Sequence, residues 1–292
     1  MTETNLTYFS FTVENTEITF YYQKNLILNS QWPAVTHMHP LHELFVMMDG
    51  EVVICSDAEQ CPLKKNEVCI LPPRYVHSVR ASAGAPRRVA LWFTYKKLRH
   101  QEGSFDFYSL LHTLSGHSVP IRFHAGETMI SMLIDVISST DKNALSSINE
   151  IKLRNIFSLL FIRLTENLPV LTPPFKEQYS KSKEYYLRLA KLNHTVNYWI
   201  YRNRSVEELA DSLFLSSRQL SNIFHDEFGM SMKTYHYFLR MHRAAYLLIY
   251  TEDSISEIAE QIGYASPEIF AIMFKRYYGV TATQYRKRNK KG

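Results

Sequence analysis

The sequence predicts a two-domain protein of the α+β class, with an N-terminal antiparallel β-barrel plus helices and a C-terminal all-α domain. Three observations support this prediction. Short apolar runs separated by turn residues fill residues 18–93, helical periodicity fills residues 183–288, and about the last 90 residues contain an internal repeat. A chain of 292 residues with 46% hydrophobic residues also fits two domains of roughly 100–200 residues each.

The first part of the chain is expected to form strands. Its apolar runs are short, and Asp49-Gly50 and Pro72-Pro73 are typical turn sequences between them. Many short strands at regular spacing favour an antiparallel sandwich or barrel. The runs cover residues 18–22, 43–48, 52–55, 68–71 and 89–93.

Two helices are expected next, at residues 127–140 and 147–167. Both have apolar residues at helical spacing over wide faces, so they pack on the barrel, pair across a dimer axis, or do both. The proline-rich stretch that begins at Pro169 then ends the second helix. The predicted domains are therefore residues 1–168 and 183–292, joined by a linker at 169–182.

The net charge is concentrated in the second domain. Residues 1–181 hold 17 of the 33 basic and 17 of the 28 acidic residues, so residues 182–292 carry the whole net charge of +5. A neutral half joined to a basic half favours one part that senses or catalyses and one that binds a polyanion.

Location is inferred from the absence of targeting signals. The sequence shows no apolar run of about 18 residues and no basic leader, so we expect neither a membrane span nor a signal peptide. The spacings of Cys55, Cys61 and Cys69 match neither a metal site nor a redox pair, and we expect reduced thiols in the cytoplasm.

The repeat consists of two copies of a pair of short helices. The first helices begin at Ser205 and Ser254, an offset of 49, and the second helices match at an offset of 50, which aligns Phe224 with Phe274. Two helices joined by a tight turn in a basic context form a helix-turn-helix motif. The two motifs are expected at about 206–228 and 256–278, with a helix from Met232 to Tyr250 between them.

The ends of these helices carry capping signals. Ser205 with Glu208 and Ser254 with Glu257 have the spacing of capping boxes. Gly229 suits a left-handed helix stop, as does Gly279, and Pro267 suits the first position of its helix. The aligned aromatic residues at 224 and 274 are expected to pack in the core.

Residues 183–288 resemble the DNA-binding domain of AraC/XylS-type transcriptional regulators. The matching pieces include Leu209-Ala210, Leu215 to Phe224, Phe228-Gly229, Arg243 to Leu248, Ile258-Ala259, Ile262-Gly263-Tyr264, Phe274-Lys275 and Tyr285-Arg286. The resemblance implies that the face of each second helix opposite the core approaches base edges. In the first copy this face carries Arg218, Ser221, Asn222 and His225, and in the second the equivalent positions are Pro267, Glu268, Ala271 and Ile272.

The two copies differ in the chemistry of that face. Arg218 could pair with guanine and Asn222 with adenine. The second copy has Ile272 where the family often has a polar or basic residue, so it is expected to contact methyl groups or to contribute little. Lys275 and Arg276 are expected to contact phosphates, and the basic tail from 286 to 291 either contacts phosphates or is merely solvated.

The segment from His37 to Gly50 resembles the metal motif of cupins. His37, His39 and Glu43 share one face of a strand, and His77 arrives from another strand. The resemblance implies a divalent transition metal, although Arg74 stands where cupins usually have glycine. Hydrogen bonding of the same side chains to a polar effector such as a sugar, or a purely structural role, remain alternatives.

The wall of an effector pocket is expected to include several aromatic and apolar side chains of the barrel. His42 has the opposite parity to Glu43 and is expected to be exposed. The candidate wall residues are Tyr22, Phe45, Met47, Tyr75 and Trp92.

Together these patterns predict a cytoplasmic, homodimeric, sequence-specific transcriptional regulator that senses a small molecule, by family resemblance a sugar or related metabolite. Its partners would be double-stranded promoter DNA, the effector and, if it activates, RNA polymerase. We expect no enzymatic activity. The alternatives are a metal-dependent cupin enzyme with an accessory nucleic-acid-binding domain, and a nonspecific architectural DNA-binding protein.

Overall fold

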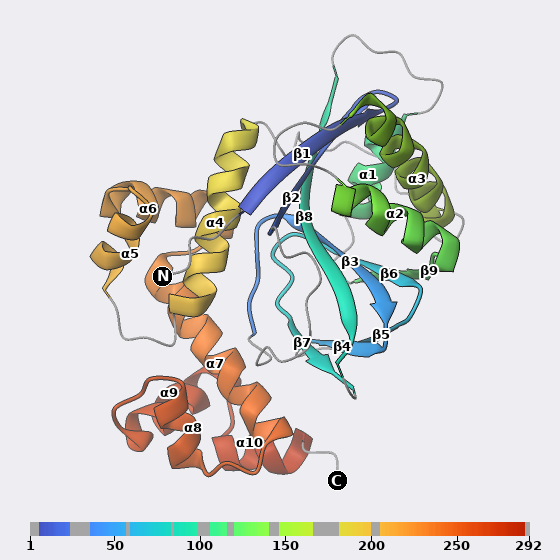
Figure 1. Cartoon of the computed structure of the whole chain (residues 1–292). Coiled ribbons are helices and arrows are strands. Elements are labelled where there is room, and N and C mark those ends of the chain that lie inside the picture. The colour runs from blue at the N-terminus through green and yellow to red at the C-terminus, as the bar shows by residue number, and fades with distance from the viewer. Residues whose placement is uncertain are drawn as a thin grey trace. The chain divides into compact units, whose positions relative to one another are not determined.

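The computed structural model describes residues 6–23, 36–56, 59–82, 85–98, 106–115, 120–139, 146–165, 181–199 and 205–289. The chain divides into two units, one of residues 1–34 and 38–191 and one of residues 35–37 and 192–292 (Figure 1). No helix in the described ranges is long and apolar enough to cross a membrane. The expected linker at 169–182 lies outside the described residues except for its last two positions.

The first unit contains two antiparallel sheets. A six-stranded sheet has the order β1-β2-β8-β3-β6-β9, and a three-stranded sheet has the order β5-β4-β7. The strands are β1 (Leu6–Val13), β2 (Thr16–Gln23), β3 (His42–Asp49), β4 (Glu51–Cys55), β5 (Gln60–Lys64), β6 (Glu67–Leu71), β7 (Ser78–Ala81), β8 (Arg87–Lys97) and β9 (Ile121–His124).

The sheets pack on each other but do not close into the expected barrel. Phe45 and Met47 of β3 share a buried cluster with Val52 and Ile54 of β4, so the interior lies between the two sheets. A closed barrel needs every strand to pair on both sides. Among the described residues the edge strands β1, β9, β5 and β7 each pair on one side only, so the antiparallel prediction is confirmed and the closed barrel is not.

Three helices belong to the other face of the large sheet: α1 (Phe107–Ser115), α2 (Glu127–Ser139) and α3 (Ser147–Thr165) (Figure 1). The ring of Phe157 in α3 stacks on that of Phe11 with centroids 5.2 Å apart and packs at a tilt against Phe20 at 4.8 Å. Because both faces of this sheet are covered, alternation along a strand does not separate buried from exposed side chains. The expectation that His42 is exposed is therefore wrong: it is 1% exposed and stacks on Phe93.

Helix α3 is apolar on two sides. Its residues Leu153, Phe157 and Leu160 are buried, whereas other apolar side chains are in solvent. The exposed apolar residues of α2 and α3 are Met132, Ile148, Ile151, Leu159 and Ile162, with 46–66% of their surface accessible. We refer to these five residues as the exposed helix stripe.

The remaining elements are helical. They are α4 (Lys183–Trp199), α5 (Val206–Ser212), α6 (Ser217–Ile223), a π-helical turn η1 (Phe224–Phe228), α7 (Met232–Tyr250), α8 (Ile255–Gln261), α9 (Pro267–Tyr278) and α10 (Ala282–Asn289). The helix expected between the two motifs has the predicted bounds. Leu220, Phe224, Phe270 and Phe274 are fully buried, as the repeat predicted.

Candidate nucleic-acid interface and histidine cluster

The first helix-turn-helix consists of α5 and α6 with η1. The capping box of Ser205 and Glu208 is present, and Ser216 with Gln219 forms a second one at the start of α6. The last turn widens into the π-helix and stops at Gly229, which has a left-handed backbone. These local bonds fix where the recognition helix begins and ends.

The face of this helix opposite the core is open to solvent. Arg218, Ser221, Asn222 and His225 are all exposed, at the spacing i, i+3, i+4 and i+7 that shares one side of a helix. The Ser221 hydroxyl donates to the carbonyl of Ser217 at 2.8 Å, so its oxygen remains able to accept. The face thus offers one guanidinium, one amide and one imidazole.

The second helix-turn-helix, α8 and α9, presents the same positions. Glu268, Ala271, Ile272 and Lys275 are exposed at the same spacing. The Ser266 hydroxyl donates to the Glu268 carboxylate, and together with the capping backbone this lowers the pKa of Glu268. The capping box at Ser254, the proline at the first turn and the left-handed stop at Gly279 are all as expected.

The basic tail is partly structural. Arg286 donates from Nε to the carbonyl of Leu248 at 3.1 Å and from its terminal nitrogen to the carbonyl of Asp253 at 2.6 Å. It therefore holds α10 against the end of α7, which neither expectation for the tail included. Lys287 and Arg288 are exposed, whereas residues 290–292 lie outside the described ranges.

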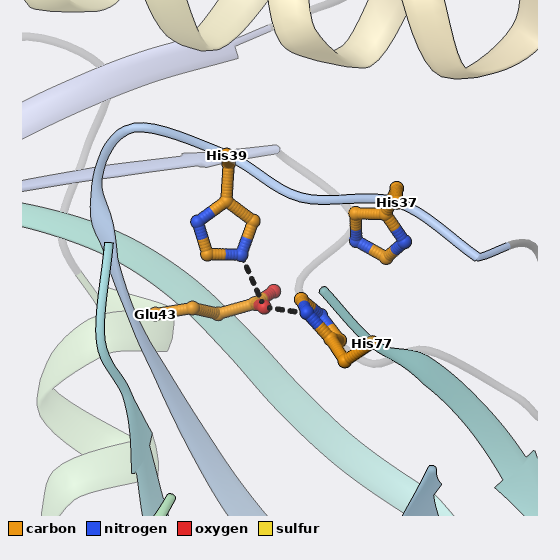
Figure 2. Close-up of side chains that lie close together, drawn as sticks. All are labelled: His37, His39, Glu43 and His77. Carbon is orange, nitrogen blue, oxygen red and sulfur yellow. Dashed lines mark hydrogen bonds and ion pairs between the residues drawn. The ribbon is translucent and has the colours of Figure 1, made fainter. Parts of the chain in front are cut away.

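In the first unit, three buried side chains converge at the start of β3. The Glu43 Oε2 atom lies 2.9 Å from Nε2 of His39 and 3.2 Å from Nε2 of His77 (Figure 2). Candidate ligand atoms of His37, His39, Glu43 and His77 all lie within 4.8 Å of one another, so the structure brings the predicted set together. Burial acts to raise the pKa of Glu43, but the charges and hydrogen bonds of His39 and His77 lower it overall.

Backbone carbonyls orient both buried imidazoles. Nδ1 of His39 lies 2.7 Å from the carbonyl oxygen of Leu41, and Nδ1 of His77 lies 2.9 Å from that of Tyr75. A carbonyl can only accept, so each Nδ1 carries the proton and each Nε2 points at the carboxylate. Histidines that bind metals are held in this way by a partner of the second nitrogen, so the residues present fit a metal.

The residues predicted to line the effector pocket do not all lie on one face of the large sheet. Trp92 pairs directly with Glu43 and with Tyr21, so these side chains share the face turned toward the small sheet, as do Phe45 and Met47. Tyr22 projects from the opposite face, where its ring meets Phe9 at 5.5 Å. Its neighbour Tyr21 takes the inner position instead.

Comparison with known proteins agrees with the helical geometry. The family described as a helix-turn-helix domain matches residues 209–288. The chain is 35% identical over 82 residues to the lactose operon transcription activator of Staphylococcus xylosus, covering 28% of this chain and 29% of that protein. It is 21% identical over 282 residues to an uncharacterized transcriptional regulator of Bacillus subtilis, covering 94% and 85% of the two chains.

Residues 209–288 match a helix-turn-helix domain, and two relatives that align along most of the chain are named as transcriptional regulators.

Solved structures similar to this chain include the C-terminal domain of a response regulator from Fusobacterium nucleatum, with 33% identity over 36% of this chain and 99% of that one and a TM-score of 0.31. ToxT of Vibrio cholerae is 15% identical over 98% of this chain and 97% of its own, with a TM-score of 0.36. Both scores are below 0.5, so the assignment of the helix-turn-helix domain rests on the sequence match over residues 209–288.

Several structural features of the chain were not expected from its sequence. Phe214, in the first turn, has a left-handed backbone and is 97% exposed. Its alignment with Gly263, 49 residues later, was the available signal. Arg88 is buried in β8 on the inner face of the sheet, and its even-numbered spacing from Trp92 was the corresponding signal.

Proposed function

We propose that this protein is a sequence-specific transcriptional regulator that binds double-stranded promoter DNA through both recognition helices and responds to a small molecule bound in its first unit. The observation that carries the proposal is the pair of matching exposed faces, Arg218 to His225 and Glu268 to Lys275, each on a capped helix-turn-helix. The proposed domains are 1–168 for sensing and dimerisation, a linker at 169–182, and 183–292 for DNA binding.

The exposed faces of α6 and α9 contact different chemical groups of the DNA in this proposal. Arg218 donates to guanine O6 and N7, and Asn222 forms paired hydrogen bonds with adenine, with Ser221 and His225 beside them. In the second helix, Ala271 and Ile272 contact thymine methyl groups, and Glu268 can accept from cytosine. Lys275 and Arg276 are exposed one turn further along and contact phosphates.

The test is selection of binding sites from random duplex DNA by the full-length protein. We expect enrichment of one motif with two separated half-sites, the first richer in defined bases than the second. The ratio of specific to random affinity should be at least about 10³ at physiological salt. A ratio near one would instead indicate the architectural DNA-binding protein considered above.

The histidine cluster supports a bound divalent transition metal, which would act as a Lewis acid or as an electrostatic anchor for the effector. Because Nδ1 of each imidazole is directed at a backbone carbonyl, Nε2 of both rings faces the Glu43 carboxylate. A metal on His39, Glu43 and His77, with His37 beside them, would bind through these Nε2 atoms and the carboxylate. The same groups hydrogen-bonded to a polar effector are the alternative.

The exposed helix stripe supports a homodimer. Apolar side chains at i, i+3, i+11 and i+14 of one helix form a seam that a second copy can cover. RNA polymerase is the further partner if the protein activates, and the cytoplasm is the proposed location. Catalysis is not proposed, because the relatives that match are named as regulators.

A further inference from the structure

We propose that Arg88 is an effector-binding residue and that the effector carries an anionic group, a carboxylate or a phosphate, on the inner face of the large sheet. This inference rests on the proposed sensing function and specifies the chemical class of the molecule sensed. It replaces the expectation of a neutral sugar with that of an acid or a phosphate ester.

The register of the strands places Arg88 on the inner face. Arg88 pairs with Met47 across β8 and β3, Ala90 pairs with Phe45, and Trp92 pairs with Glu43. Directly paired residues project from the same face of a sheet. Arg88 therefore belongs to the same surface as the histidine cluster, two rows along the strand from Glu43.

Arg88 is buried without a counter-ion. It is 8% exposed, its Nε has no hydrogen-bond partner, and no carboxylate of the described residues forms an ion pair with it. Burial lowers the pKa of Arg88, and only the more distant charge of Glu43 opposes that effect. A guanidinium stays charged in proteins, so this site keeps a buried positive charge that an anion can neutralise.

The surroundings of Arg88 favour a bound molecule over a structural partner. Ala90 and Trp92 are only half-buried, although the face they share is the interior of the sandwich. Trp92 also has a buried Nε1 with no partner, and this atom can only donate. Two unpaired donors on one face fit a ligand with acceptor oxygens.

The histidine cluster engages the acidic side chain that lies on the same face of the sheet as Arg88. The carboxylate of Glu43 already faces His39 and His77, so it is not free to serve Arg88 (Figure 2). A bidentate carboxylate or phosphate matches the planar fork of arginine.

The test compares the melting temperature of full-length wild type with that of Arg88→Met, in a buffer without phosphate or carboxylate. The probes are sodium phosphate and sodium acetate, each against sodium chloride at equal ionic strength. Arg87→Met is the matched control, because Arg87 is its exposed neighbour on the opposite face. Arg88→Lys keeps the positive charge but lacks the planar guanidinium group, which can donate two parallel hydrogen bonds to one anion.

We expect phosphate or acetate to raise the Tm of wild type and of Arg87→Met by at least about 2 °C more than that of Arg88→Met, with Arg88→Lys between them. The probe that acts identifies the phosphate or the carboxylate source. We also expect Arg88→Met to melt no lower than wild type without anions, because it removes an unpaired buried charge.

Equal anion-dependent shifts in wild type and Arg88→Met, or no shift in wild type, would overturn the assignment. A lower Tm for ligand-free Arg88→Met together with equal shifts would show that Arg88 is structural. Site selection from random DNA is independent of these measurements. Its failure would remove the proposed function, whereas failure here would leave DNA binding intact.

Discussion

Phe214 and Gly263 occupy equivalent places in the two helix-turn-helix turns, and both have a left-handed backbone, with φ of 56° and 80°. Glycine adopts this conformation without strain, whereas a side chain with a Cβ atom does not. The first turn therefore has an exposed phenylalanine with a left-handed backbone at the position where the second turn has glycine. Because Phe214 is 97% exposed, packing does not compensate for the strain.

Replacing Phe214 with glycine should stabilise the protein by about 1 kcal/mol, because the left-handed conformation then carries no penalty. Phe214→Ala keeps the Cβ atom and should leave stability nearly unchanged. Gly263→Ala should destabilise, since the φ of 80° at Gly263 is a conformation that a residue with a Cβ atom adopts only with strain. Urea unfolding of the three variants measures these differences, and an Ala variant as stable as the Gly variant at 214 would contradict the strain argument.

Asn222→Ala should weaken binding to the selected operator by about 1–3 kcal/mol while leaving affinity for random DNA unchanged. The side chain is exposed, so folding should not change. Phe224→Ala, two residues along the same helix, should instead lower stability by about 3–5 kcal/mol because it opens a cavity in the core. Fluorescence anisotropy measures the affinity of each variant for the selected operator and for random DNA. Equal losses of affinity on the two DNAs would refute base contact by Asn222.

Leu159→Glu and Leu160→Glu should have opposite consequences although the residues are adjacent. Leu159 is 54% exposed in the exposed helix stripe, so a charge there should break the dimer and leave a folded monomer. Leu160 is 2% exposed, so a charge there should unfold the first unit. Light scattering and circular dichroism separate the two results. A folded dimer of Leu159→Glu would exclude this stripe as the interface.

Stability should fall as the solution is acidified below about pH 6.5. Burial, with smaller contributions from the charges of His39 and His112, lowers the pKa of His42 to about 3. Between pH 3 and pH 6.5, His42 is protonated in the unfolded state but stays neutral in the folded state. The free energy of unfolding therefore rises with pH across this range. His42→Phe should flatten that part of the profile, measured as urea midpoints from pH 4 to 8. An unchanged slope would show that His42 is not the group responsible.

The histidine cluster should bind one divalent ion per chain. Native mass spectrometry of protein supplied with Zn²⁺ should show an added mass that EDTA removes, and His77→Ala should lose it because a buried ligand is missing. His124→Ala is the control, since His124 is exposed on β9. Wild type that stays free of metal under these conditions would favour the effector-binding alternative for the same side chains.

Features set by local chemistry could be predicted from the sequence. The capping boxes depend on residues three apart, and the bounds of α7 follow from periodicity and flanking polar residues. The convergence of His39 and Glu43 was predicted from strand parity, but the reason was wrong: β3 begins at His42, so His39 precedes the strand and reaches Glu43 from the segment before it. Each of these depends on one short segment, where the backbone geometry leaves few choices.

Features set by distant pairing could not be predicted in this way. Parity shows that His42 and Glu43 project from opposite faces, but not that helices cover one of them. The face of Tyr22 depends on the register of β2 against β8, which the sequence does not display. The unpaired edges that leave the barrel open, and the burial of Arg88, likewise arise only when separate strands meet.

The two hydrogen bonds from Arg286 to the carbonyls of Leu248 and Asp253 set a practical boundary for shortening the chain. A basic terminal segment is often trimmed to improve solubility or crystals. A cut before residue 286 would remove both hydrogen bonds, so the carbonyls of Leu248 and Asp253 would bind water instead. The end of α7 and the loop that leads to the second helix-turn-helix would then no longer be held by α10. Proteolysis of that helix pair should accelerate accordingly, so trimming should begin only after residue 289.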